Sequence, residues 1–197
     1  MDITDYRSCA LKNNSATHFK KNSHGFTLIE LIITLAIVAI IAAFGIPNVS
    51  AMVQTNRMAA AMNGLSASFA YARSEAITRH HEVVVCKSYD GTSCIREGGW
   101  EQGWIIFHDL NGNEKRDEDE RIFRVQDSLP PGISVDFSAF RSEHFVHYWA
   151  TGFTKMNGTF TFCQENNRLK PKALILSKVG RIRKSKTHWD GSPLECP

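Results

Sequence analysis

The sequence lacks the motifs by which most enzyme classes are recognised. It contains no glycine-rich nucleotide-binding loop, no nucleophile elbow and no pair of carboxylates in a recognisable catalytic frame. No two cysteines stand two residues apart, and no histidine pair stands at a matching distance, so a zinc site is not indicated. Internal repeats and low-complexity linkers are absent too. We therefore expect no enzymatic activity, no cofactor and no bound metal.

A large excess of charge of one sign is also missing. The chain has 23 Lys and Arg residues against 20 Asp and Glu residues, a formal net charge of +3, which alone does not imply a nucleic-acid partner. The distribution is uneven, however. From residue 164 onward eight basic residues face only three acidic ones, and residues 1–25 hold four basic and two acidic residues. The middle of the chain is therefore acidic, and the positive charge lies at the ends.

Cysteine is scarce, with five residues in the chain. Cys9 lies in the polar N-terminal segment, and the other four follow the apolar run described below. Four cysteines in a compact extracytoplasmic domain suggest two disulfides, with three possible connectivities. We favour Cys86–Cys94, which closes a short loop, and Cys163–Cys196, which pins the C-terminal tail. Free buried thiols are the alternative.

One long apolar run extends from Phe26 to Ile46 and is interrupted only by two threonines and Glu30. At about 1.5 Å per residue, a helix of this length spans the roughly 30 Å hydrocarbon core of a bilayer. Lys20 and Lys21 precede the run, so its N-terminal side should stay in the cytoplasm. The run is too long for a secretory signal peptide. An ordinary signal-anchor helix is the alternative.

Glu30 is the residue that a signal anchor does not explain. A carboxylate in hydrocarbon costs a few kcal/mol or more unless it is paired, so intramembrane acids are usually functional. If the chain were cut after Gly25, the new amino terminus at Phe26 would lie about one helical turn from Glu30. The terminus of a neighbouring subunit could reach the same carboxylate.

The run His24-Gly25-Phe26-Thr27-Leu28-Ile29-Glu30, after a basic leader and at the start of a long apolar helix, resembles the prepilin cleavage motif of type IV pilins and type II secretion pseudopilins. The resemblance implies that prepilin peptidase cuts after Gly25 and methylates Phe26, and that Glu30 guides docking into the growing filament. It makes residues 1–25 a cleaved cytoplasmic leader and residues 26–47 the transmembrane, filament-core half of a helix. The protein would be a single-pass inner-membrane protein with a periplasmic C-terminal domain.

The rest of the chain predicts an α+β fold. Residues 48–79 continue the helix, because apolar side chains recur at three- and four-residue steps: Met58, Met62, Leu65, Phe69, Ala72 and Ala76. Residues 80–197 form a β-rich domain with a basic C-terminal tail. Seven segments rich in β-formers and bounded by turn residues are expected as strands: 82–89, 104–108, 121–126, 133–138, 145–149, 159–163 and 173–178.

This pattern is similar to the FimT/GspH family of minor pilins, in which a long helix packs on two small antiparallel sheets, with a short hairpin before the C-terminus. The Asp109–Asn113 turn and the Val179–Arg183 segment carry the resemblance in the globular part. In FimT-type minor pilins a Gly-Arg-x-Arg motif near the C-terminus binds DNA. Gly180-Arg181-Ile182-Arg183 matches it residue by residue.

The basic tail is therefore the candidate binding surface: Lys178, Gly180, Arg181, Arg183, Lys184 and Lys186. If a strand follows the turn, Arg181 and Arg183 point to the same side, and Gly180 permits a tight turn. Trp189 lies just beyond and could stack on bases. We expect non-specific phosphate contacts with double-stranded DNA. A solvated basic face, or one ion-paired to a neighbouring subunit, is the alternative.

The leading hypothesis is thus a minor type IV pilin that catches DNA during natural transformation, within a pilus or at its tip. Its partners would be double-stranded DNA, other major and minor pilins, prepilin peptidase and the inner membrane. The alternative is a GspH-type minor pseudopilin of type II secretion, or a minor pilin that primes assembly. An unrelated membrane-anchored periplasmic enzyme or sensor is a third, weaker hypothesis.

Two further sets of residues are interpreted structurally. Five oxygen-bearing residues have the spacing of a calcium loop: Asp109, Asn111, Asn113, Asp117 and Glu120. Glu114, however, occupies the position at which such a loop needs glycine, so we prefer an acidic, solvated hairpin loop. His144 and His147 are expected at surface or sheet positions.

Overall fold

The computed structural model describes residues 25–140, 142–165 and 169–196, and for residues 44–48 the backbone only. The chain divides into two units, Met1–Ile46 and Pro47–Pro197. Helix α1 (Leu28–Arg79) begins in the first unit and ends in the second. The predicted leader, residues 1–25, lies outside the described residues except for Gly25.

Thr27 caps the start of α1. Its hydroxyl oxygen accepts a hydrogen bond from the Glu30 backbone N–H at 3.3 Å, and its carbonyl accepts the Leu31 N–H at 3.2 Å. A threonine followed three residues later by a glutamate is the sequence of a capping box. Glu30 in the first turn also lies near the positive end of the helix dipole. The helix therefore begins three residues beyond Gly25 because the local sequence favours a start there.

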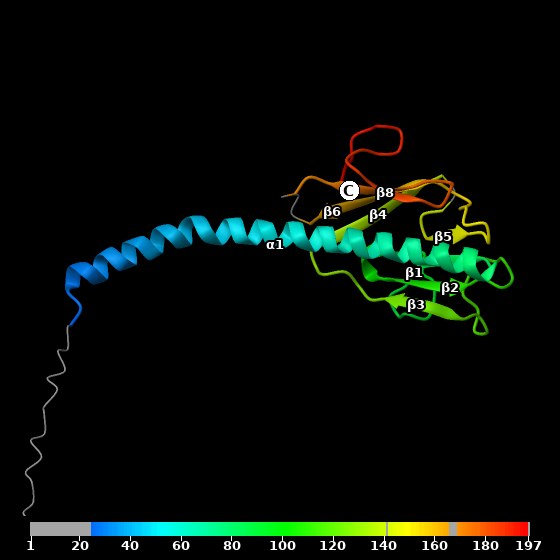
Figure 1. Cartoon of the computed structure of the whole chain (residues 1–197), viewed down its shortest axis with the longest axis horizontal. Coiled ribbons are helices and arrows are strands. Elements are labelled where there is room, and N and C mark those ends of the chain that lie inside the picture. Colours follow the sequence, from blue (N-terminus) through cyan, green and yellow to red (C-terminus); the bar gives the residue numbers. More distant parts are fainter. Residues whose placement is uncertain (1–24, 141, 166–168, 197) are drawn as a thin grey trace, which may run out of the picture. The chain divides into compact units, whose positions relative to one another are not determined.

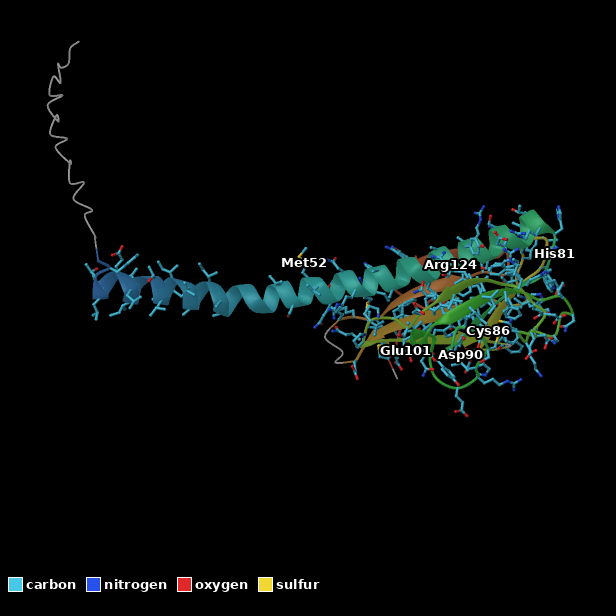
Figure 2. The ribbon with its side chains drawn as sticks, turned by 90° about the horizontal axis from the view of Figure 1, so that it is seen from below. Met52, His81, Cys86, Asp90, Glu101 and Arg124 are labelled. Carbon is cyan, nitrogen blue, oxygen red and sulfur yellow. A yellow bond between two sulfur atoms is a disulfide. The ribbon has the colours of Figure 1, made fainter. Side chains whose placement is uncertain are left out.

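The other end of α1 is closed without glycine. His80 adopts left-handed backbone (φ 55°), and the His81 N–H donates to the Ala76 carbonyl at 3.3 Å. A hydrogen bond from an N–H to the carbonyl five residues earlier, next to a left-handed residue, is characteristic of a Schellman motif. Figure 2 shows His81 at this end of the helix. The predicted helix end at Arg79 is confirmed, and the chain turns at once into the first strand.

The second half of α1 buries one face against the sheets. The stripe predicted from the sequence is buried throughout, with at most 4% exposure at each position: Met58, Met62, Leu65, Phe69, Ala72 and Ala76. The Phe69 ring lies 5.1 Å from that of Phe160 and 6.0 Å from that of Trp100. Phe69 therefore joins the helix to the strand layers at the centre of the core.

In the part of the chain that the structure describes, eight strands form two four-stranded antiparallel sheets (Figure 1). The first has the order β3-β2-β1-β5: β1 (Val83–Lys87), β2 (Trp104–His108), β3 (Ile122–Gln126) and β5 (Phe145–Tyr148). The second has the order β4-β6-β7-β8: β4 (Ile133–Ala139), β6 (Gly158–Gln164), β7 (Lys172–Leu176) and β8 (Ile182–Ser185). A short 3-10 helix, η1 (Trp100–Gln102), precedes β2. The seven expected strands correspond to β1–β7, and β8 lies in the basic tail.

The structure contains the two disulfides favoured from the sequence. Cys86 at the end of β1 is joined to Cys94, and Cys163 in β6 is joined to Cys196 beside the C-terminus. The second bond spans 33 residues and encloses β7, β8 and the loop that follows β8. The basic tail is therefore anchored at its far end to a central strand of the second sheet.

Removing the longer cross-link should cost more stability than removing the shorter one. Loop-closure entropy predicts a loss of about 3–4 kcal/mol for Cys163→Ala/Cys196→Ala and about 2–3 kcal/mol for Cys86→Ala/Cys94→Ala. Equilibrium urea unfolding without reductant measures both. A greater loss for the 8-residue separation of Cys86 and Cys94 than for the 33-residue separation would contradict this explanation.

Candidate functional site

The first candidate surface is the N-terminal half of α1. Every Leu, Ile and Val side chain between Leu28 and Ile41 is at least 51% exposed. In Figure 2 the side chains of this stretch project all round the ribbon. Single exposed apolar residues are ordinary, but a continuous apolar surface indicates a site that lipid or another protein covers. Among the described residues, the first buried core residue is Met58, so the core includes none of Leu28–Ile41.

None of the helices in the described part of the chain combines the length and the hydrophobicity that a bilayer span requires. The assignment of residues 26–47 to a membrane-spanning half stays a prediction.

Glu30 lies on this exposed apolar surface. No cationic group among the described residues comes within ion-pair distance of its carboxylate. An amino group of another chain, or the amino terminus that a cut after Gly25 would release, could therefore pair with it. The roles of Gly25, Phe26 and Glu30 in processing stay predictions.

The second candidate surface is the basic tail, which begins with the hairpin between β7 and β8. The Ser177 N–H donates to the Arg181 carbonyl at 2.9 Å, and Arg183 pairs with Ile175 across the hairpin. Ile182 packs against the core, so the alternation of side chains directs Arg183 to the outer face. That Arg181 and Arg183 share one side stays a prediction, since Arg181 precedes β8.

The cations of the tail are open to solvent. All five are exposed: Lys178, Arg181, Arg183, Lys184 and Lys186. Within the described part of the chain, no carboxylate lies at ion-pair distance from any of them. Because β8 is the edge strand of its sheet, a large anionic partner can reach this row of charges without displacing another element.

Gly180 has a structural role in this hairpin. It is buried and left-handed (φ 74°), and a Cβ added there would lie 2.0 Å from the Gly152 carbonyl oxygen and 3.0 Å from Arg73 Nε. Arg73 Nε donates to the same Gly152 oxygen at 3.0 Å, and the Tyr148 hydroxyl donates to the Gly180 carbonyl at 3.4 Å. Gly180 therefore fits the hairpin against α1 and β5, and any contribution to binding comes through the shape of the tail.

Trp189 borders a cleft that local sequence reasoning did not identify. It is 62% exposed and faces the same hollow as Lys178, together with Phe140 and Lys155. Phe140 follows β4 and Lys155 follows β5, so only the fold brings them to the tail. The local sequence signal that could have pointed to Phe140 is an aromatic residue directly before Arg141.

The acidic loop after β2 uses its oxygen atoms internally. The Asp109 carboxylate accepts three backbone N–H groups at 2.8–3.2 Å: those of Gly112, Asn113 and Glu114. The Glu120 carboxylate accepts the N–H groups of Leu110 and Asp117. Side-chain amides of Asn111 and Asn113 bond Asp117 and hold the pKa of that carboxyl below its usual value. This pattern fits the hydrogen-bonded hairpin loop that we preferred to a calcium loop.

Comparison with protein families matches two parts of the chain. Residues 20–46 match the family described as the prokaryotic N-terminal methylation motif, and residues 61–180 match the family described as type II transport protein GspH. The chain belongs to the GspH family. Membership makes it a non-enzymatic structural protein of the pilin class, and the methylation motif implies processing by prepilin peptidase and assembly with other pilins. Proteins with this motif are typically anchored in the inner membrane before assembly.

The structures of FimU that resemble this GspH-family chain support its fold. Two crystal forms of the type IV minor pilin FimU of Pseudomonas aeruginosa match it. The first has a TM-score of 0.54 and 20% sequence identity, and the match covers 68% of this chain and 92% of FimU. The second has a TM-score of 0.50 and 21% identity, and the match covers 64% of this chain and 90% of FimU. The minor pseudopilin EpsH of the Vibrio cholerae type 2 secretion system matches with a TM-score of 0.48 and 11% identity, over 66% and 96%. No curated protein matches the chain. The α+β pilin-like fold is confirmed.

Gly180→Ala should destabilise the protein by about 2–4 kcal/mol, because the new methyl group meets a backbone oxygen and the backbone is left-handed. Gly191→Ala is the matched control: its φ is 89°, but a Cβ there meets nothing within 4 Å. It should cost only about 1 kcal/mol. Thermal unfolding followed by circular dichroism measures both. Equal losses would show that the contact with Gly152 does not matter.

Proposed function

We propose that this protein is a minor pilin-type subunit that enters a type IV pilus or the related type II secretion filament through the first half of α1. The observation that carries the proposal is the continuous exposed apolar surface of Leu28–Ile41, in a chain with the N-terminal methylation motif. Before assembly, lipid of the inner membrane covers this surface. Within a filament, the corresponding helices of other subunits cover it.

Glu30 sets the axial position of the subunit in this proposal. Prepilin peptidase cuts after Gly25, and Phe26 becomes the methylated amino terminus. The terminal amine of the neighbouring subunit then neutralises the Glu30 carboxylate, because leaving that carboxylate unpaired among apolar side chains costs several kcal/mol. Only one axial position of the neighbouring subunit brings its terminal amine to the Glu30 carboxylate, so this ion pair favours one docked arrangement.

The family match supports the secretion or assembly role more directly than DNA uptake. It covers residues 61–180 under the description of a type II transport protein. The likeness to FimU concerns the fold alone. We therefore place a GspH-type pseudopilin, or a minor pilin that primes assembly, before a DNA-uptake pilin.

Glu30→Ala should reduce incorporation into filaments by at least about tenfold, because it removes the partner of the terminal amine. Thr34→Ala is the control one turn further along the helix, where the Thr34 hydroxyl donates to the Leu31 carbonyl at 2.9 Å. It should leave incorporation unchanged. Quantitative immunoblots of sheared filaments and membranes, with mass spectrometry of the processed terminus, provide the readout. Wild-type incorporation of processed Glu30→Ala subunits would refute the role of this residue.

A second candidate function is DNA binding by the basic tail, and the row of exposed, unpaired cations on β8 and its turn favours it. Arg181 and Arg183, flanked by Lys178, Lys184 and Lys186, offer exposed cations to the phosphates of DNA, and phosphate contacts carry no sequence information, so binding would be non-specific. For about three to five phosphate contacts, the logarithm of the affinity should fall with the logarithm of salt concentration with a slope of roughly −3 to −5.

Arg181→Ala/Arg183→Ala should remove about two units of this salt slope and weaken binding at least about tenfold at low salt. The control is Arg121→Ala/Arg124→Ala, which removes the same charge from exposed positions at β3 (Arg124 is labelled in Figure 2). Fluorescence anisotropy with labelled duplex DNA and the full chain in detergent measures both. Equal weakening in the two variants, or no binding by the wild type at low salt, would exclude a DNA-binding tail.

A further inference from the structure

A cluster of charged residues lies on the outer face of the first sheet. The register pairs Val83 with His108, so Glu82 stands opposite Asp109, and the Asp109 N–H donates to the Glu82 carbonyl at 3.1 Å. On the other side of β1, Val84 pairs with His147. Three neighbouring strands thus bring two carboxylates and one imidazole to the same end of the sheet.

Alternation places all three side chains on one face. Glu82 shares the face of Val84, Asp109 shares that of Phe107, and His147 stands beside Val84 in the ladder. This is the face of the smaller apolar cluster formed by Val84, Cys86, Ile105 and Phe107. The opposite face of the sheet packs against α1. The acidic loop after β2 closes over the outer face and adds Glu114, which takes left-handed backbone (φ 65°).

His147 is fully buried, yet neither of its ring nitrogens makes a hydrogen bond to any described residue. Glu82 Oε2 lies 2.8 Å from Nε2, and Glu114 Oε1 lies 3.5 Å from Nδ1. The Glu82 oxygen is therefore within reach of the nitrogen but not in line with an N–H. Two ligand atoms bound to one metal ion are arranged in this way, because the nitrogen lone pair points at the ion and not at the neighbouring oxygen.

The charges of the cluster are not balanced. Glu82, Asp109 and Glu114 contribute three carboxylates, and Lys155 Nζ, 2.6 Å from Glu114 Oε1, neutralises one of them. With a neutral imidazole, two negative charges remain in a site whose His147 and Asp109 are buried. Burying unpaired charge is costly, and a divalent cation would remove the excess.

We propose that Glu82, Asp109 and His147 form a binding site for a zinc-class divalent transition metal. One ligand atom of each already lies within 4.8 Å of the others. Bonds of about 2.0–2.2 Å to one ion place the ligand atoms roughly 3–3.5 Å apart. Glu82 Oε2, now 2.8 Å from His147 Nε2, would move slightly away from it, and the wider separations would close slightly. An imidazole with two carboxylates suits zinc better than calcium or magnesium, which prefer oxygen ligands alone. A fourth position is left for water.

The surroundings of the ligands fit the same assignment. With Nε2 on the metal, the Nδ1–H would donate to Glu114, and a carboxylate behind a metal-bound histidine orients the ring. The three backbone N–H groups on Asp109 fix its carboxylate, which still has acceptor capacity for a metal. A bound ion would tie β1, β5 and the loop after β2 together. This inference is independent of the proposed function.

The test uses the full chain in a non-ionic detergent, without a polyhistidine tag and stripped with a chelator. Zinc chloride is titrated by calorimetry, and cobalt(II) reports the ligand set through its visible spectrum. We expect one zinc ion per chain with a Kd of about 1 µM or tighter. Glu82→Gln should weaken binding at least about tenfold, and Glu114→Gln should weaken it by about 10–100-fold. Both side chains are partly exposed, so these variants should fold, which circular dichroism checks.

The matched control is His81→Gln. His81 is exposed and lies 4.3 Å, centroid to centroid, from the His108 ring, so this pair is the rival zinc site. Unchanged affinity in His81→Gln, with loss in Glu82→Gln, supports the proposal. Loss of binding in His81→Gln would overturn it, as would wild-type affinity in both Glu82→Gln and Glu114→Gln. An absence of binding heat and of a cobalt spectrum in the wild type would overturn it as well.

Discussion

Both sheets of the globular domain depend on one packed surface, the buried stripe on the second half of α1. Phe69 is at its centre. The rings of Trp100, Tyr148 and Phe160 lie within 6.4 Å of the Phe69 ring, centroid to centroid. Ala72 and Ala76, one and two turns further, are small enough to let the strands approach the helix closely. A 52-residue helix is thereby divided by its own sequence into a half whose apolar side chains are exposed and a half whose apolar stripe the chain covers itself.

Features that depend on local sequence were predictable. The capping Thr27, the 3.6-residue periodicity of the Met58–Ala76 stripe and the β-rich segments between turn residues each carry their signal within a few positions. Cys86–Cys94 is favoured by the short loop it closes, and Cys163–Cys196 by the C-terminal tail it pins, and both bonds are present. The register between strands is different, because it joins residues far apart in the chain. The sequence showed His147 only as a sheet or surface residue, and its complete burial beside Glu82 follows from the pairing of β5 with β1.

The same limit applies to the tail. The Gly-Arg-x-Arg run can be read directly, and the prediction that Arg181 and Arg183 lie on one side follows from strand geometry. The reason for glycine at position 180 cannot be inferred from the sequence. Position 180 must be glycine because Gly152, Arg73 and Tyr148, which come from distant parts of the chain, pack against it. A motif recognised as a binding signature can thus contain a residue whose requirement is internal packing.

The disulfide between Cys163 and Cys196 has a mechanical consequence. An edge strand is normally the easiest element to peel from a sheet, because a pull on its free end breaks one hydrogen bond at a time. Here β8 has no free end: β7 holds it on one side, and the covalent bond to β6 closes the loop on the other. A pull on the C-terminal end of the chain is therefore borne by the covalent bond to β6 before it reaches the hydrogen bonds of β8.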